Sequence, residues 1–167
     1  MIPNEIRDSL KKICAILNRH RVDCMLIGGT AVGFYGYQRI SGISVFNLEM
    51  KSDLDFWYSP SNENFLNIVK ALSELEVDTT ELEKTIFDPL RTYLKIPFEK
   101  FHLDFLPQMK GLSSYLSCKK NARKEIIDGN EFFFIGLSDL IANKIAGGRV
   151  IDKDDLDDLN NLQKEQK

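Results

Sequence analysis

Two short segments of the chain alternate apolar and polar residues, and together they carry three carboxylates, Asp53, Asp55 and Asp104. A period of two predicts β-strands, in which residues i and i+2 point to the same face of a sheet. Asp53 and Asp55 therefore project together, while Leu54 and Phe56 point into a core. Asp104 lies between two apolar residues in the second segment, which we expect to be a central strand.

Three carboxylates on one face of a sheet repel one another unless a cation lies between them. Magnesium is the usual partner, because it takes hard oxygen ligands. Two such ions can bind both the attacking and the leaving oxygen of a phosphoryl transfer. The alternative is an ordinary strand with acidic residues facing solvent. A glycine pair upstream favours the metal site.

This glycine pair, Gly28 and Gly29, stands between a predicted strand and a predicted helix. Glycine lets backbone N–H groups come close to a ligand, and the N-terminus of a helix adds positive potential. With the Thr30 hydroxyl, the turn is suited to binding phosphate. It is neither a Walker loop nor a GxGxxG motif, so a plain tight turn is the alternative. Followed by the carboxylate strands, it fits a nucleotide–magnesium complex.

The composition is that of one ordinary globular domain. The chain has 167 residues, of which 43% are hydrophobic and 28% charged, and this length suits a single domain. We expect a core over 1–136 with C-terminal helices over 137–167 packed on it. The net charge of −3 gives no overall sign of nucleic-acid binding. Three cysteines without a CxxC pair indicate reduced thiols, and we expect a cytoplasmic protein without a membrane span.

The remaining pattern predicts an α/β (α+β) fold, in which helices pack on a mixed β-sheet. Capping residues and helical periodicity predict helices that begin at Asn4, at Ser61 or Asn62, at Ser138 and at Asp152. Further helices are expected over 30–37 and 112–118, and strands over 22–27, 91–96, 101–106 and 131–135. Residues 40–51 are expected to form an irregular insertion, and residues 76–88 give no clear pattern.

These motifs together resemble the nucleotidyltransferase fold of the DNA polymerase β superfamily. The resemblance is carried by Ile27-Gly28-Gly29, by Asp53-Leu54-Asp55-Phe56 and by the later Asp104. The C-terminal part resembles the AbiEii-type and minimal nucleotidyltransferases, some of which are toxins of toxin–antitoxin pairs. Here it is carried by Lys144 in an Asp-Leu helix, by Gly-Gly-Arg at 147–149 and by Asp152 and Asp155. The resemblance covers about residues 22–160.

The resemblance implies a role for each matching residue. Asp53, Asp55 and Asp104 would bind magnesium, two ions in all, and Asp104 would also help deprotonate the incoming hydroxyl. Phosphate contacts would come from Gly28, Gly29, Thr30 and Lys144. Arg39 would fix the nearby loop or the nucleotide, although the insertion at 40–51 could displace it. Lys51 stands where the related group often has Thr.

The function that this resemblance implies is a magnesium-dependent nucleotidyltransferase. It would move a nucleoside monophosphate from a nucleoside triphosphate such as ATP to a hydroxyl acceptor and release pyrophosphate. Two acceptor classes stay open: a toxin-like enzyme modifies RNA or protein and has an antitoxin partner, whereas an antibiotic-type transferase modifies a small molecule. A non-catalytic nucleotide-binding domain with the same fold is the third alternative.

Overall fold

The structure is a computed structural model that describes residues 4–37 and 53–165. Within these residues, six strands form one mixed sheet in the order β3-β4-β2-β1-β6-β5. The strands are β1 (Cys24–Leu26), β2 (Leu54–Tyr58), β3 (Leu94–Pro97), β4 (His102–Leu106), β5 (Arg123–Ile127) and β6 (Asn130–Phe134). The helices are α1 (Asn4–Arg19), α2 (Gly28–Tyr37), α3 (Asn62–Glu74), α4 (Thr80–Glu83), α5 (Tyr115–Lys119), α6 (Leu137–Gly147) and α7 (Ile151–Glu165).

The centre of the sheet combines parallel and antiparallel pairs. β2 lies between β4, to which it is parallel, and β1, to which it is antiparallel. β1 is parallel to β6, whereas β3 and β5 form antiparallel edges on β4 and β6. The two carboxylate-bearing segments of the sequence are thus neighbouring interior strands. This mixed sheet with packed helices confirms the predicted fold class.

The core takes large side chains from both faces of β2. Leu54 and Phe56 are buried, and the Phe56 ring stacks on Phe105 of β4 with 5.7 Å between ring centroids. Trp57, on the other face, is also buried and donates a hydrogen bond from Nε1 to the carbonyl of Pro107 at 3.1 Å. Burial of these large side chains is the main favourable term that holds β2 and β4 together.

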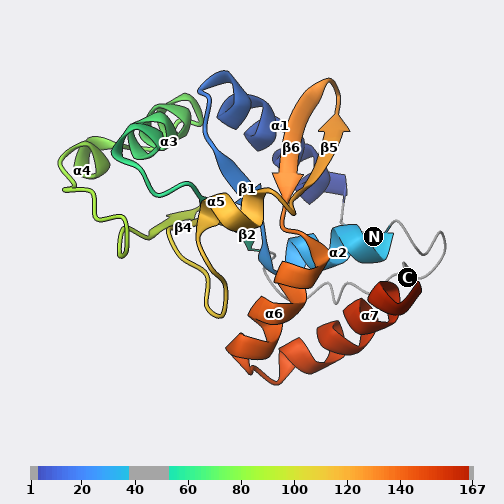
Figure 1. Cartoon of the computed structure of the whole chain (residues 1–167). Coiled ribbons are helices and arrows are strands. Elements are labelled where there is room, and N and C mark those ends of the chain that lie inside the picture. Colours follow the sequence, from blue (N-terminus) through green and yellow to red (C-terminus); the bar gives the residue numbers. More distant parts are fainter. Residues whose placement is uncertain (1–3, 38–52, 166–167) are drawn as a thin grey trace.

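The helices enclose the sheet from several sides, as Figure 1 shows. α1 packs against β6 and α3, while α2 packs against β2 and also contacts α6 and α7. In Figure 1, α6 and α7 lie side by side next to α2, away from α3 and α4. The helices that follow the last strand therefore gather beside the helix that follows the glycine pair. None of the described helices is both long and apolar enough to cross a membrane.

Several predicted elements and boundaries differ from the structure. β5 was not predicted, although Asp128 and Gly129 form a turn with positive φ that is typical of a hairpin. Gly136 rather than Ser138 is the N-cap of α6. Asp152 lies inside α7 instead of capping it. The Ser61 cap is confirmed, because its side chain accepts a hydrogen bond from the Asn64 amide at 3.2 Å.

Candidate functional site

The structure brings the three predicted carboxylates together on one face of the sheet. Asp55 of β2 and Asp104 of β4 are direct register partners across the parallel pair. Asp53 immediately precedes β2, and its carboxylate lies 3.2 Å from Nδ1 of His102, two residues before Asp104 on β4. This adjacency depends on the strand order, which brings two segments about fifty residues apart in the chain into contact.

The glycine turn lies directly against this cluster. A Cβ atom on Gly28 would lie 2.3 Å from Oδ2 of Asp55, and Gly28 has a φ of +67°. The Ile27 amide donates to the Asp55 carbonyl at 2.9 Å, and the Thr30 hydroxyl donates to the Asp53 carbonyl at 3.1 Å. Thr30, predicted to contact phosphate, thus ties the first turn of α2 to the carboxylate strand. The first N–H groups of a helix have no acceptor within it, so this turn places amide donors beside Asp55.

The cluster perturbs the ionisation of its central member. Burial, followed by repulsion from Asp104 and then Asp53, raises the pKa of Asp55 to about 6. Lys95 and Arg149 act in the opposite direction on the same carboxyl. A carboxylate with a raised pKa near other acidic groups is typical of functional sites. A cation at this place would remove the repulsion.

The two oxygens of Asp104 have different surroundings. Oδ2 accepts a hydrogen bond from the Tyr93 hydroxyl at 2.5 Å, and Lys95 Nζ lies 3.7 Å from it. Oδ1 is buried and has no hydrogen-bond partner among the described residues. A buried carboxylate oxygen left unpaired costs free energy. Such an oxygen is a natural ligand for a hard cation.

The residues present fit magnesium, although they do not form a complete set of ligands by themselves. Asp53 is engaged by His102, whose Nδ1 lies 3.2 Å from Oδ1 of Asp53. In the described part of the chain, no three His, Cys, Asp or Glu side chains converge as a ready metal site. Magnesium commonly binds through one or two carboxylates together with phosphates of a substrate. The unpaired Oδ1 of Asp104 and the neighbouring Asp55 match that arrangement.

Lys144, predicted to contact phosphate, is buried between α6 and α7. Its Nζ donates to Asp152 at 2.8 Å and to Asp155 at 2.7 Å. Arg149, in the turn between the two helices, donates to Asp152 at 3.0 Å and keeps a largely exposed side chain. Arg149 is also one of the two cations that lower the pKa of Asp55. Arg149, rather than the buried Lys144, is therefore the exposed positive charge in this region that acts on Asp55.

Three predicted features lie outside the described residues. Arg39 falls between residue 37 and residue 53, as do the insertion at 40–51 and Lys51. Their predicted roles remain predictions. Sequence reasoning also missed two partners of Asp104, namely Tyr93 and Lys95. Tyr93 and Lys95 alternate along the strand predicted over 91–96, which was expected to form a hairpin with 101–106. This alternation was the signal that could have placed them beside Asp104.

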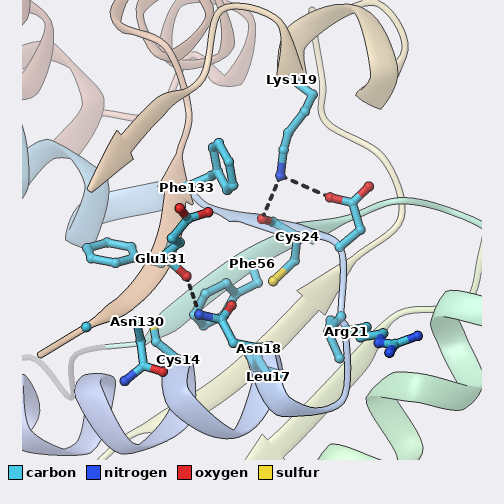
Figure 2. A pocket seen from close by; sticks show the side chains of 14 residues that line it. Cys14, Leu17, Asn18, Arg21, Cys24, Phe56, Lys119, Asn130, Glu131 and Phe133 are labelled. Atoms are coloured by element: carbon cyan, nitrogen blue, oxygen red, sulfur yellow. Dashed lines mark hydrogen bonds and ion pairs between the residues drawn. The ribbon is translucent and has the colours of Figure 1, made fainter. Parts of the chain in front are cut away.

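A separate cavity of about 480 Å³ lies between the end of α1, the start of β1 and the β5–β6 hairpin (Figure 2). Phe56 lines it and points to the opposite face of β2 from its neighbour Asp55. Asn18 bridges part of the opening by donating to the Glu131 carbonyl at 2.5 Å. The cavity is therefore distinct from the carboxylate cluster.

Comparison with known protein families adds one finding. Residues 6–167 match the model of a family described as "Nucleotidyl transferase of unknown function (DUF2204)". The match covers nearly all of the chain and includes every residue of the carboxylate cluster and the glycine turn. No curated protein matches the chain.

Proposed function

The chain belongs to this family of nucleotidyl transferases of unknown function, and we propose that it is a magnesium-dependent enzyme acting on nucleoside triphosphates. The observation that carries the proposal is the register pairing of Asp55 with Asp104, with the Gly28 turn against Asp55. Phosphate-binding amides and metal-binding carboxylates then share one end of the sheet. Nucleotidyl transfer needs both groups at the same triphosphate.

The proposed reaction transfers a nucleoside monophosphate to a hydroxyl group. The acceptor oxygen forms a bond to the α-phosphorus, the bond from that phosphorus to the bridging oxygen breaks, and pyrophosphate leaves. The hydroxyl proton passes to a carboxylate of the cluster. Bound magnesium supplies charge neutralisation at the phosphates.

The protein residues contribute binding, orientation and charge. Asp53, Asp55 and Asp104 would hold the cation, and the amides at Gly28 and Gly29 would bind phosphate oxygens. Arg149 would add positive charge at the rim of the cluster. Positioning and electrostatic stabilisation supply most of the catalysis in phosphoryl transfer.

The acceptor is proposed to be a hydroxyl on a cationic small molecule or on a protein. The net charge of −3 disfavours a polyanionic acceptor such as RNA. The protein acceptor corresponds to the toxin-like alternative, with an antitoxin as partner, and the small molecule to the antibiotic-type alternative. Pyrophosphate release on adding candidate acceptors of each class would distinguish them.

Calorimetric titration of ATP, GTP, CTP and UTP, with and without magnesium, tests the nucleotide site. We expect the wild type to bind at least one triphosphate in a magnesium-dependent manner. The double variant Asp53→Ala/Asp55→Ala should lose this binding, because the cation loses two of its ligands. The matched control is Asp157→Ala/Asp158→Ala, which removes two exposed carboxylates from α7 and should bind as the wild type does.

Absence of binding of all four triphosphates by folded wild-type protein would contradict the proposal. Magnesium-dependent binding without pyrophosphate release for any acceptor would instead support a non-catalytic nucleotide-binding domain. Equal loss of binding in both double variants would show that the effect does not come from the cluster.

A further inference from the structure

Only one of the two carboxylate oxygens of Asp104 has a hydrogen-bond partner among the described residues. Tyr93 precedes the edge strand β3, and Lys95 lies within it as the register partner of Asp104. The Tyr93 hydroxyl takes Oδ2 at 2.5 Å, while Oδ1 stays buried without a partner among the described residues. Hydrogen bonds from a hydroxyl to a carboxylate at this distance belong to the strong, charge-assisted class. Asp104 is therefore held in one orientation before any cation binds.

We propose that Tyr93 restricts Asp104 to coordination through a single oxygen and thereby favours magnesium over calcium at the cluster. This inference rests on the proposed function, because it assumes that the carboxylates bind a divalent cation. Tyr93 is a positioning residue in this proposal: it acts on the cation through Asp104.

The physical basis is the difference in how the two cations use carboxylates. Magnesium requires near-octahedral geometry at short distances, whereas calcium accepts six to eight oxygens, often with one carboxylate bound through both of its oxygens. Chelation of a cation by both oxygens of Asp104 would compete with the Tyr93 hydrogen bond for the lone pairs of Oδ2. Tyr93 thus makes calcium binding through both oxygens less favourable. Magnesium binding through Oδ1 alone leaves the Tyr93 hydrogen bond intact.

The contact that distinguishes Tyr93 is the hydrogen bond that its hydroxyl donates to Oδ2 of Asp104. Lys95, at 3.7 Å from Oδ2, acts differently, because its positive charge opposes any cation at the cluster to a similar extent.

The test compares Tyr93→Phe with Tyr115→Phe at pH 8, in the absence of nucleotide. Tyr93 is 47% exposed, so loss of its hydroxyl should not prevent folding. Tyr115 makes the same kind of bond, from its hydroxyl to Asp23 at 2.7 Å, on a helix outside the cluster. Free Mn²⁺ is followed by electron paramagnetic resonance, and competition with Mg²⁺ and Ca²⁺ gives the two dissociation constants.

We expect the ratio of the calcium to the magnesium dissociation constant to fall about tenfold in Tyr93→Phe, the effect of one hydrogen bond to a charged group. The ratio should be unchanged in Tyr115→Phe. In Lys95→Gln both cations should bind more tightly by similar factors, again without a change in the ratio. An unchanged ratio in Tyr93→Phe, with cation binding retained, overturns the inference.

Failure of the proposed function gives a different result. If the wild type binds none of the three cations, or if Asp104→Asn binds them as the wild type does, the cluster is not a metal site and both proposals are overturned. If the wild type binds and Asp104→Asn does not, the metal site stands and the Tyr93 ratio alone decides the inference.

Discussion

At the scale of single residues, the site depends on how closely Gly28 approaches Asp55. Gly28 has positive φ and leaves no space for a Cβ atom beside the Asp55 carboxylate, whereas a Cβ atom on Gly29 would meet nothing within 4 Å. The two glycines of the pair are therefore not equivalent. The first is needed for backbone conformation and close packing, and the second leaves the helix N-terminus open.

Gly28→Ala should lower the free energy of unfolding by at least about 1–2 kcal/mol, the cost of a left-handed backbone for alanine. The displaced Asp55 carboxylate should also weaken Mn²⁺ binding. Gly29→Ala, within α2, is expected to be neutral or to stabilise by up to about 1 kcal/mol. Chemical denaturation and Mn²⁺ titration of both variants check this. Equal effects of the two substitutions would contradict the assignment.

Asp55 should make the metal-free protein less stable as the pH rises. Its pKa is raised to about 6 in the folded protein, against about 3.9 in an unfolded chain. Between these values the folded state binds more protons, so stability falls from about pH 4 to pH 6 and then stays low. Asp55→Asn removes this loss and should be the more stable protein at pH 8, by at most about 3 kcal/mol.

Thermal denaturation from pH 4 to pH 8 without divalent cations measures this difference. The advantage of Asp55→Asn should be largest above pH 6 and should vanish near pH 4. Asp157→Asn, an exposed substitution on α7, provides the control and should follow the wild type. A variant at position 55 that is no more stable than the wild type at pH 8 would contradict the raised pKa.

At the scale of elements, a buried ion cluster joins α6 to α7. Asp152 is 1% exposed and accepts from both Lys144 and Arg149. Burial alone would raise the pKa of Asp152, yet the hydrogen bonds from Arg149 and Lys144 hold it below its ordinary value. The two helices that follow the sheet are thus fixed to each other by charge as well as by apolar contacts. This fixes the turn that carries Arg149.

Asp152→Asn should destabilise the protein by about 1–3 kcal/mol, because Lys144 and Arg149 lose the carboxylate they share, while Lys144 keeps its contact with Asp155. Lys144→Met should cost less, since Asp152 keeps its contacts with Arg149. Chemical denaturation measures both losses. Asp158→Asn, exposed on the same helix, should stay within about 0.5 kcal/mol of the wild type. A larger loss in Lys144→Met than in Asp152→Asn would contradict this ranking.

At the scale of the whole molecule, the strand order decides what the residues can do together. The central strand β2 is parallel to β4 and antiparallel to β1. The first relation brings Asp104 beside Asp55, and the second brings the end of β1 and the Gly28 turn to the same carboxylate. Neither relation follows from the pattern of a single segment. The site is therefore a property of the assembled sheet.

The predicted C-terminal helices illustrate the same limit. Their existence and approximate extent follow from periodicity and from the glycines at 147 and 148, and Gly148 adopts the left-handed conformation that ends α6. The partner of Lys144 could not be predicted, because a lysine on a helix is solvated unless another helix covers it. The α7 helix covers it here and supplies two carboxylates.

Local periodicity is enough to predict which residues share a face of a strand. Alternation at 53–56 fixes Asp53 and Asp55 on one side and Leu54 and Phe56 on the other, because the period of an extended backbone is local. The partners of each carboxylate, by contrast, depend on the assembled sheet. Pairing of Asp55 with Asp104, and of Asp104 with Tyr93, depends on strand neighbours and register, which are set by packing between distant parts of the chain.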